Sequence, residues 1–118
     1  MISVKNIFKK YGKFHDAELS MVKWSFLERR IELIISDINS AFCGLPEYVG
    51  EQPGAIVFSE VSKIDIEFDP FEEGLTIYGC NIEDDNEEGG GALSIVFWPH
   101  GRISVRFSLL EIITNQFS

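Results

Sequence analysis

The chain has 118 residues, 45% of them hydrophobic, with ten lysine and arginine residues against nineteen aspartate and glutamate residues and a net charge of −9. This length and apolar content predict one domain with a single core, which buries about two thirds of the surface that the unfolded chain exposes. The acidic balance argues against unaided binding to nucleic acid, because that binding depends on lysine and arginine side chains that displace counterions from phosphates.

The cysteines and the apolar runs narrow the class of protein further. Cys43 and Cys80 are too few for a disulfide framework, and we expect both to be free thiols. No apolar run reaches the length of about 18 residues that a membrane-spanning helix needs, and lysines interrupt the first segment where a signal peptide has its apolar core. We therefore expect a cytoplasmic protein without membrane contact.

The first 13 residues predict a short amphipathic helix that covers one end of a sheet. Apolar residues recur at helical spacing at Val4, Ile7, Phe8 and Tyr11. Ser3 is a suitable N-cap and Gly12 a suitable end. The segment also holds four lysines, but four cations on a chain of this net charge make a weak membrane anchor.

Residues 14–38 predict a first hairpin. The hydrophobic period changes to two after Asp16, and a phase slip at Met21-Val22 indicates a β-bulge. Residues 30–38 return as a second strand with Ile31, Leu33 and Ile35 on one face.

A long loop at 39–54 follows, with two prolines and three glycines. Loops of this length in compact domains are often functional, and one hypothesis places Tyr48 at the mouth of a ligand pocket there. The remaining residues, 55–118, alternate in a strand-like way with turns between them. Residues 83–91, with five acids before three glycines, predict a solvated connection, and 109–117 fits either a strand or a short helix. The expected fold is a single, mainly β domain, an antiparallel meander of about six strands with a short N-terminal helix.

His15 and Asp16 are the natural candidates for acid-base chemistry, since an imidazole beside a carboxylate is common in active sites. An enzyme would use them with Glu18. The alternative, which we favour, is that Asp16 satisfies backbone donors at the start of the first strand while His15 packs or bonds a main-chain carbonyl.

The sequence gives little indication of a metal or cofactor site. The chain has two histidines and two cysteines without the spacing of a metal site, and the acidic loop lacks the ligand order of a calcium loop. Nucleophile and phosphate-loop motifs are also absent from the sequence. We therefore expect no metal, no cofactor and no enzymatic activity.

An acidic surface is the better candidate for function. Partner-binding residues are predicted at Asp65, Glu67, Asp69, Glu72, Glu73, Asp84 and Asp85. Such a surface steers and holds a basic partner protein. Ordinary solubility is the alternative explanation for the same charge.

The five residues Phe14-His15-Asp16-Ala17-Glu18, followed at once by an alternating hairpin, resemble the F-H-D-A/S-E motif of a group of small bacterial β-rich proteins. That group includes predicted immunity proteins of polymorphic toxin systems, together with uncharacterised relatives. The likeness extends over 14–38 and 55–108, including the spacing of Phe58, Val61 and Ile64.

The resemblance implies a protein that neutralises a cognate toxin by binding it without turnover. The acidic balance of the chain is compatible with a basic toxin. It carries over no toxin-contacting residues, and the motif residues are expected to be structural. A small binding module of another kind, for a ligand or a protein, is the alternative. For the oligomeric state, we expect a monomer or a homodimer through a strand edge.

Overall fold

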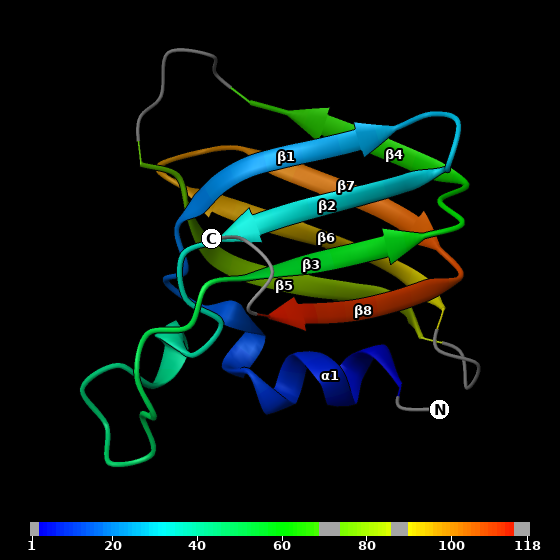
Figure 1. Cartoon of the computed structure of the whole chain (residues 1–118). Coiled ribbons are helices and arrows are strands. Elements are labelled where there is room, and N and C mark those ends of the chain that lie inside the picture. The colour runs from blue at the N-terminus through cyan, green and yellow to red at the C-terminus, as the bar shows by residue number, and fades with distance from the viewer. Residues whose placement is uncertain (1–2, 69–73, 86–89, 115–118) are drawn as a thin grey trace.

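Two antiparallel sheets face each other in the computed structural model, and a short helix, α1, lies along one side of them (Figure 1). The structure describes residues 3–68, 74–85 and 90–114. The strand order is β1-β2-β3-β8 in the first sheet and β4-β7-β6-β5 in the second. The protein is therefore mainly β, and among its described residues no helix is long and apolar enough to cross a bilayer.

The elements have the following bounds: α1 Val4–Lys10, the 3-10 turn η1 Gly12–Phe14, β1 Leu19–Ser25, β2 Arg30–Ile35, the 3-10 turn η2 Ser40–Phe42, β3 Gly54–Ser59, β4 Lys63–Glu67, β5 Thr76–Asp85, β6 Gly91–Trp98, β7 Arg102–Phe107 and β8 Leu109–Thr114.

The first hairpin forms as its alternating pattern predicts. β1 pairs antiparallel with β2, and Ile31, Leu33 and Ile35 turn one face of β2 into the core with almost no exposure. The predicted β-bulge is present, with the register shift between Leu19 and Met21, slightly earlier than the sequence indicated. Ser3 caps α1 as expected, because its hydroxyl accepts a hydrogen bond from the Asn6 N–H.

The chain changes sheet at two corners. Between β3 and β4 it crosses at residues 60–62, and between β7 and β8 it crosses at Ser108. Both corners are tied by backbone hydrogen bonds, from Ser62 to Arg106 and from Ser108 to Ser59. The two sheets are consequently joined at these corners and enclose one core.

Phenylalanine rings form part of that core, although isoleucine, leucine and valine side chains outnumber them. The Phe58 and Phe107 rings, one from each sheet, lie 4.9 Å apart. Phe97 is also buried, while α1 contributes Val4 and Phe8 from the side. Ring contacts of this kind bury large apolar areas and join the two layers.

Three expectations about the fold need correction. The described residues form eight strands rather than about six, and the order is not a simple meander, because β3 pairs with β8. The predicted connection at 83–91 begins as strand: β5 continues through Asp85 because Ile82 and Asp84 still pair with β6. Residues 109–114, open between strand and helix, form β8.

Candidate functional site

The F-H-D-A-E motif forms the corner between η1 and β1. Phe14 is fully buried, with its ring edge-on to Phe8 at 5.3 Å and stacked on Tyr11 at 5.0 Å. The backbone that leads to this position has three consecutive residues in the left-handed region, with φ of 60° at Gly12, 59° at Lys13 and 56° at Phe14. A left-handed conformation costs a residue with a Cβ about 1–2 kcal/mol, so burial of Phe14 has to hold this turn in place.

His15 and Asp16 meet because the chain turns between them. Nδ1 of His15 lies 3.0 Å from the Tyr78 carbonyl oxygen, and since that oxygen only accepts, Nδ1 is the donor. Nε2 lies 3.5 Å from Oδ1 of Asp16, whose side chain is 71% exposed. The Asp16 carboxylate therefore faces solvent and His15, rather than the backbone donors that we expected it to bind.

The backbone of the motif, and not its carboxylates, secures the corner. The Asp16 N–H donates to the Ile77 carbonyl, and the Ile77 N–H donates to the Ala17 carbonyl. The Glu18 N–H donates to the Ser36 hydroxyl at 3.1 Å, and Glu18 pairs with Thr76 in an isolated bridge. The motif thus joins the start of β1 in the first sheet to β5 in the second.

The predicted partner-binding acids occupy both edges of the second sheet. Asp65 and Glu67 point outward from β4, and Asp84 points outward from β5, while Asp69, Glu72 and Glu73 lie outside the described residues. We name the outer face of this sheet the charged face. It is defined by Lys63, Asp65, Glu67, Glu83, Asp84, Arg102 and Arg106.

Basic residues between the acids are the part that sequence reasoning missed. β7 runs through the middle of the charged face, where Arg102 lies 3.5 Å from Asp65 and Arg106 lies 3.2 Å from Asp84. The alternation of these arginines with Ile103 and Val105 was visible in the sequence, but their place beside the acids depends on strand order. Exposed pairs of this kind contribute little stability and are open to exchange with a partner.

A polar hollow of about 280 Å³ lies on the charged face above two serines. Ser94 is 6% exposed, and its hydroxyl donates to Oε1 of Glu83 over 2.8 Å. The Ser104 hydroxyl lies 2.8 Å from the same Ser94 oxygen. Small residues on β6 and β7 therefore leave a shallow, hydrogen-bonded centre that longer charged side chains surround.

Asp85, also predicted to bind a partner, makes a contact with α1. Its Oδ1 accepts from the Val4 N–H at 3.0 Å and its Oδ2 from the Lys5 N–H at 3.4 Å. These are the first backbone donors of α1, which have no partner inside the helix. A carboxylate there also interacts favourably with the positive end of the helix dipole. Asp85 thereby fastens α1 to the end of β5.

A hollow of about 770 Å³ lies between α1 and β5. Lys5, Lys9 and Lys13 line one wall, and the acids of 83–85 line the other. Cys80 lines the hollow between those walls, and burial raises the pKa of its thiol to about 12. The hollow thus has walls of opposite charge and a neutral, unreactive thiol.

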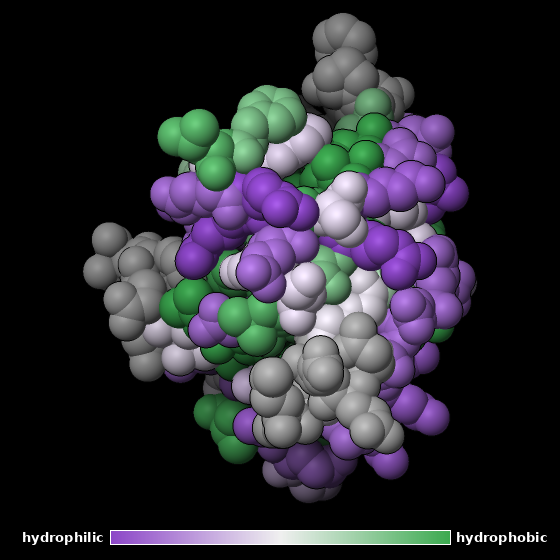
Figure 2. All heavy atoms as spheres, turned by 90° about the vertical axis from the view of Figure 1, so that its right-hand side faces the viewer, coloured by the Kyte–Doolittle hydropathy of each residue, from purple (hydrophilic) through white to green (hydrophobic). Residues whose placement is uncertain are grey.

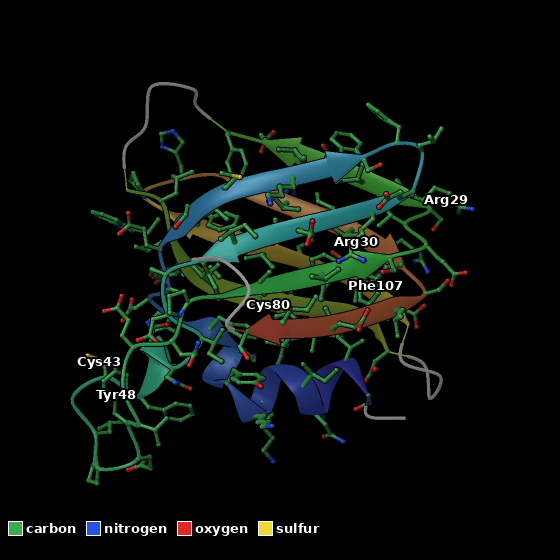
Figure 3. The ribbon with its side chains drawn as sticks, viewed as in Figure 1. Arg29, Arg30, Cys43, Tyr48, Cys80 and Phe107 are labelled. Carbon is green, nitrogen blue, oxygen red and sulfur yellow. The ribbon has the colours of Figure 1, made fainter. Side chains whose placement is uncertain are left out.

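Tyr48 is bonded within the segment that carries the long loop. Its hydroxyl donates to Oδ2 of Asp37 over 2.8 Å, and that bond raises the pKa of Tyr48 to about 12. Figure 3 shows Tyr48 and Cys43 on the loop that projects from the lower left of the sandwich. Tyr48 lines none of the hollows described above, and its contact anchors the loop.

Among the described residues no group of three or more His, Cys, Asp and Glu side chains is arranged to hold a metal ion. Comparison of the chain with protein-family models and with curated proteins finds no match.

Proposed function

We propose that this chain is a non-enzymatic protein-binding domain that neutralises a cognate protein toxin by contact in the cytoplasm. The observation that carries the proposal is a concentration of charge: residues 65–88 hold ten acids and no lysine or arginine. In the fold this segment supplies most of β4 and all of β5, the two edge strands of the second sheet. This charge favours a partner with a basic surface, and the resemblance of the F-H-D-A-E motif supports a toxin as that partner.

The geometry of the charged face indicates how such a partner would bind. Arg102 and Arg106 hold Asp65 and Asp84 through exposed contacts, which cationic side chains of a partner can replace at little cost. The excess of acid steers the encounter over a longer range, so association should slow as salt rises. His15 and Asp16, by contrast, make contacts at the sheet corner that favour a structural role over the enzyme hypothesis.

The test uses the product of the reading frame next to this gene as the binding probe. The two proteins are produced together, and growth of the host is followed with and without this chain. Affinity is then measured by titration calorimetry for the wild type and for a variant with Asp65→Asn, Glu67→Gln and Glu83→Gln. We expect growth to be restored by the wild type and the affinity of the variant to fall by about tenfold or more.

Glu111→Gln is the matched control, since Glu111 lies on β8 in the other sheet. It should leave the affinity unchanged. A neighbouring product that is not toxic, or binding that resists both salt and the triple substitution, would rule the proposal out.

A further inference from the structure

The corner where the β1–β2 turn meets the connection between β3 and β4 presents large apolar side chains to solvent. Leu27 is 97% exposed, Phe26 79% and Trp24 43%, and the Trp24 and Phe26 rings are in contact at 4.7 Å. Figure 2 faces this end of the sandwich and shows green side chains projecting near the top, beside purple ones. Apolar groups gathered on the surface of so charged a chain mark a contact site.

Hydrogen bonds hold this corner in a fixed shape. The Arg29 N–H donates to the Phe26 carbonyl, and the Glu28 N–H donates to the Ser25 hydroxyl, so the turn is closed on itself. Two further bonds join it to the next connection: the Val61 N–H donates to the Arg29 carbonyl at 2.9 Å, and Nε of Arg29 donates to the Val61 carbonyl at 3.3 Å. A preformed surface loses little conformational entropy when it binds.

Between the two connections lies a hollow of about 150 Å³, which we name the corner notch. Its lining includes Trp24, Phe26, Arg29, Val61, Lys63 and Ile64. A hollow of this size accommodates a group as large as a benzene ring. Figure 3 shows Arg29 at this end of the strands, pointing away from the sheets.

The charges around the notch have one sign. Arg29 and Lys63 are the charged side chains that line it among the described residues. Glu28 and Glu60 belong to the same two connections but do not line the hollow. The notch therefore combines apolar walls with two cations, a composition that recurs at the centres of protein interfaces.

We propose that the corner notch docks a segment of a partner protein that inserts an apolar side chain beside Trp24 and Phe26 and sets a carboxylate against Arg29 and Lys63. Charge complementarity selects this partner, since a basic segment would meet two cations of its own sign. The inference stands apart from the proposed function. Among the described residues, only Lys63 borders both the notch and the charged face.

Two other occupants fit less well. A second copy of the chain, docked symmetrically through the notch, would place Arg29 and Lys63 of one copy near the same cations of the other. A bilayer surface rich in anionic lipids would attract these two cations, but its extended negative potential would repel a chain with a net charge of −9 more strongly than a single carboxylate of a partner would.

The test selects random heptapeptides displayed on phage against the folded protein. We expect the recovered peptides to share a large apolar residue next to aspartate or glutamate. The chain has two tryptophans, so Trp98→Phe leaves Trp24 as the single fluorescent reporter. Emission of Trp24 should shift to the blue when a recovered peptide is added, because its indole loses contact with water.

Substitutions at the notch then separate the proposal from nonspecific adhesion. Phe26→Ser and Arg29→Gln should each weaken peptide binding by about tenfold, the effect of removing a central interface residue. The matched controls are Val49→Ser, at an apolar residue that is 82% exposed elsewhere, and Lys10→Gln, at an exposed cation of α1. Both should bind as the wild type does. Thermal unfolding of each variant checks that it is folded.

Several results would overturn the proposal. They are recovery of no peptide, recovery of peptides without acidic residues, and peptide binding that survives Phe26→Ser. Two further outcomes, in place of peptide binding, would equally refute the proposal. Phe26-dependent dimers in sedimentation would assign the notch to a second copy of the chain. Phe26-dependent binding to phosphatidylcholine vesicles with added phosphatidylglycerol would assign it to lipid.

Discussion

The Tyr48 hydroxyl donates to Oδ2 of Asp37 across 2.8 Å, and this contact closes the long loop between β2 and β3. The other oxygen of Asp37 accepts from the N–H groups of Asn39 and Gln52, at 2.9 and 3.0 Å. Asp37 is 8% exposed, so one nearly buried carboxylate holds both ends of the loop and its middle.

Asp37→Ala should destabilise the protein by about 3 kcal/mol, from about 1 kcal/mol for each of the three hydrogen bonds that it removes. Urea unfolding measures the change in the free energy of unfolding. Glu47→Ala is the control, because Glu47 is an exposed acid of the same loop. An equal effect of both substitutions would contradict this role of Asp37.

The same contact predicts a pH dependence at the alkaline end. Because the folded pKa of Tyr48, about 12, lies above its ordinary value of 10.0, folding favours the protonated phenol. Its contribution to stability is complete below pH 10 and is lost as pH rises toward 12. The melting temperatures of the wild type and of Tyr48→Phe should therefore converge over that interval, and a constant difference would count against the Asp37 contact.

Lys13→Gly should stabilise the protein, which is unusual for a change to glycine. Lys13 is exposed and takes φ of 59°, a conformation that glycine adopts without steric cost. The relief of about 1–2 kcal/mol exceeds the entropy cost of glycine, about 0.5–1 kcal/mol, and leaves a gain of roughly 0.5 kcal/mol. Chemical denaturation measures this gain in the free energy of unfolding.

Lys9→Gly supplies the control within α1. Lys9 lies in the α-helix, so glycine relieves no left-handed conformation there and should lower the free energy of unfolding by about 1 kcal/mol. If both changes lower stability alike, the left-handed turn does not strain Lys13.

Asp85→Ala should loosen α1, because it removes the carboxylate that accepts from the Val4 and Lys5 N–H groups. Loss of such a cap costs about 1 kcal/mol, and amide hydrogen exchange within α1 should speed up accordingly. Asp84→Ala, which breaks only an exposed pair with Arg106, should leave exchange in α1 as it was. Equal protection in both variants would show that Asp85 does not hold the helix.

The two thiols should react at very different rates. Cys43 is exposed, whereas Cys80 is buried and its pKa is raised to about 12. Ellman's reagent at pH 8 should label one thiol rapidly and the second only on unfolding, since the thiolate is the reactive form. In Cys43→Ser the rapid phase should vanish, and its persistence would place Cys80 at the surface.

Local pattern was sufficient to predict the helix and the first hairpin. The alternation of Ile31, Leu33 and Ile35 predicts a strand with one buried face, whichever strand pairs with it. Burial of Phe14 follows from its apolar ring.

The division of the strands into two sheets could not be predicted from local pattern. Alternation does not reveal that β3 pairs with β8, some fifty residues later, or that the chain changes sheet at Ser108. For the same reason the sequence did not place Arg102 and Arg106 among the acids, or bring Asp85 to Val4 across 81 residues. Each of these contacts depends on tertiary pairing rather than on spacing.

The pairing of β3 with β8 has a consequence for the protein during its synthesis. β3 lies between β2 and β8 in the first sheet, so until β8 leaves the ribosome β3 is an unpaired edge of Ala55, Ile56, Val57 and Phe58. An apolar edge of this kind is prone to pair with other chains. The nascent chain thus presents this apolar edge from the emergence of β3 until β8 emerges, and that is the interval in which a chaperone would protect it.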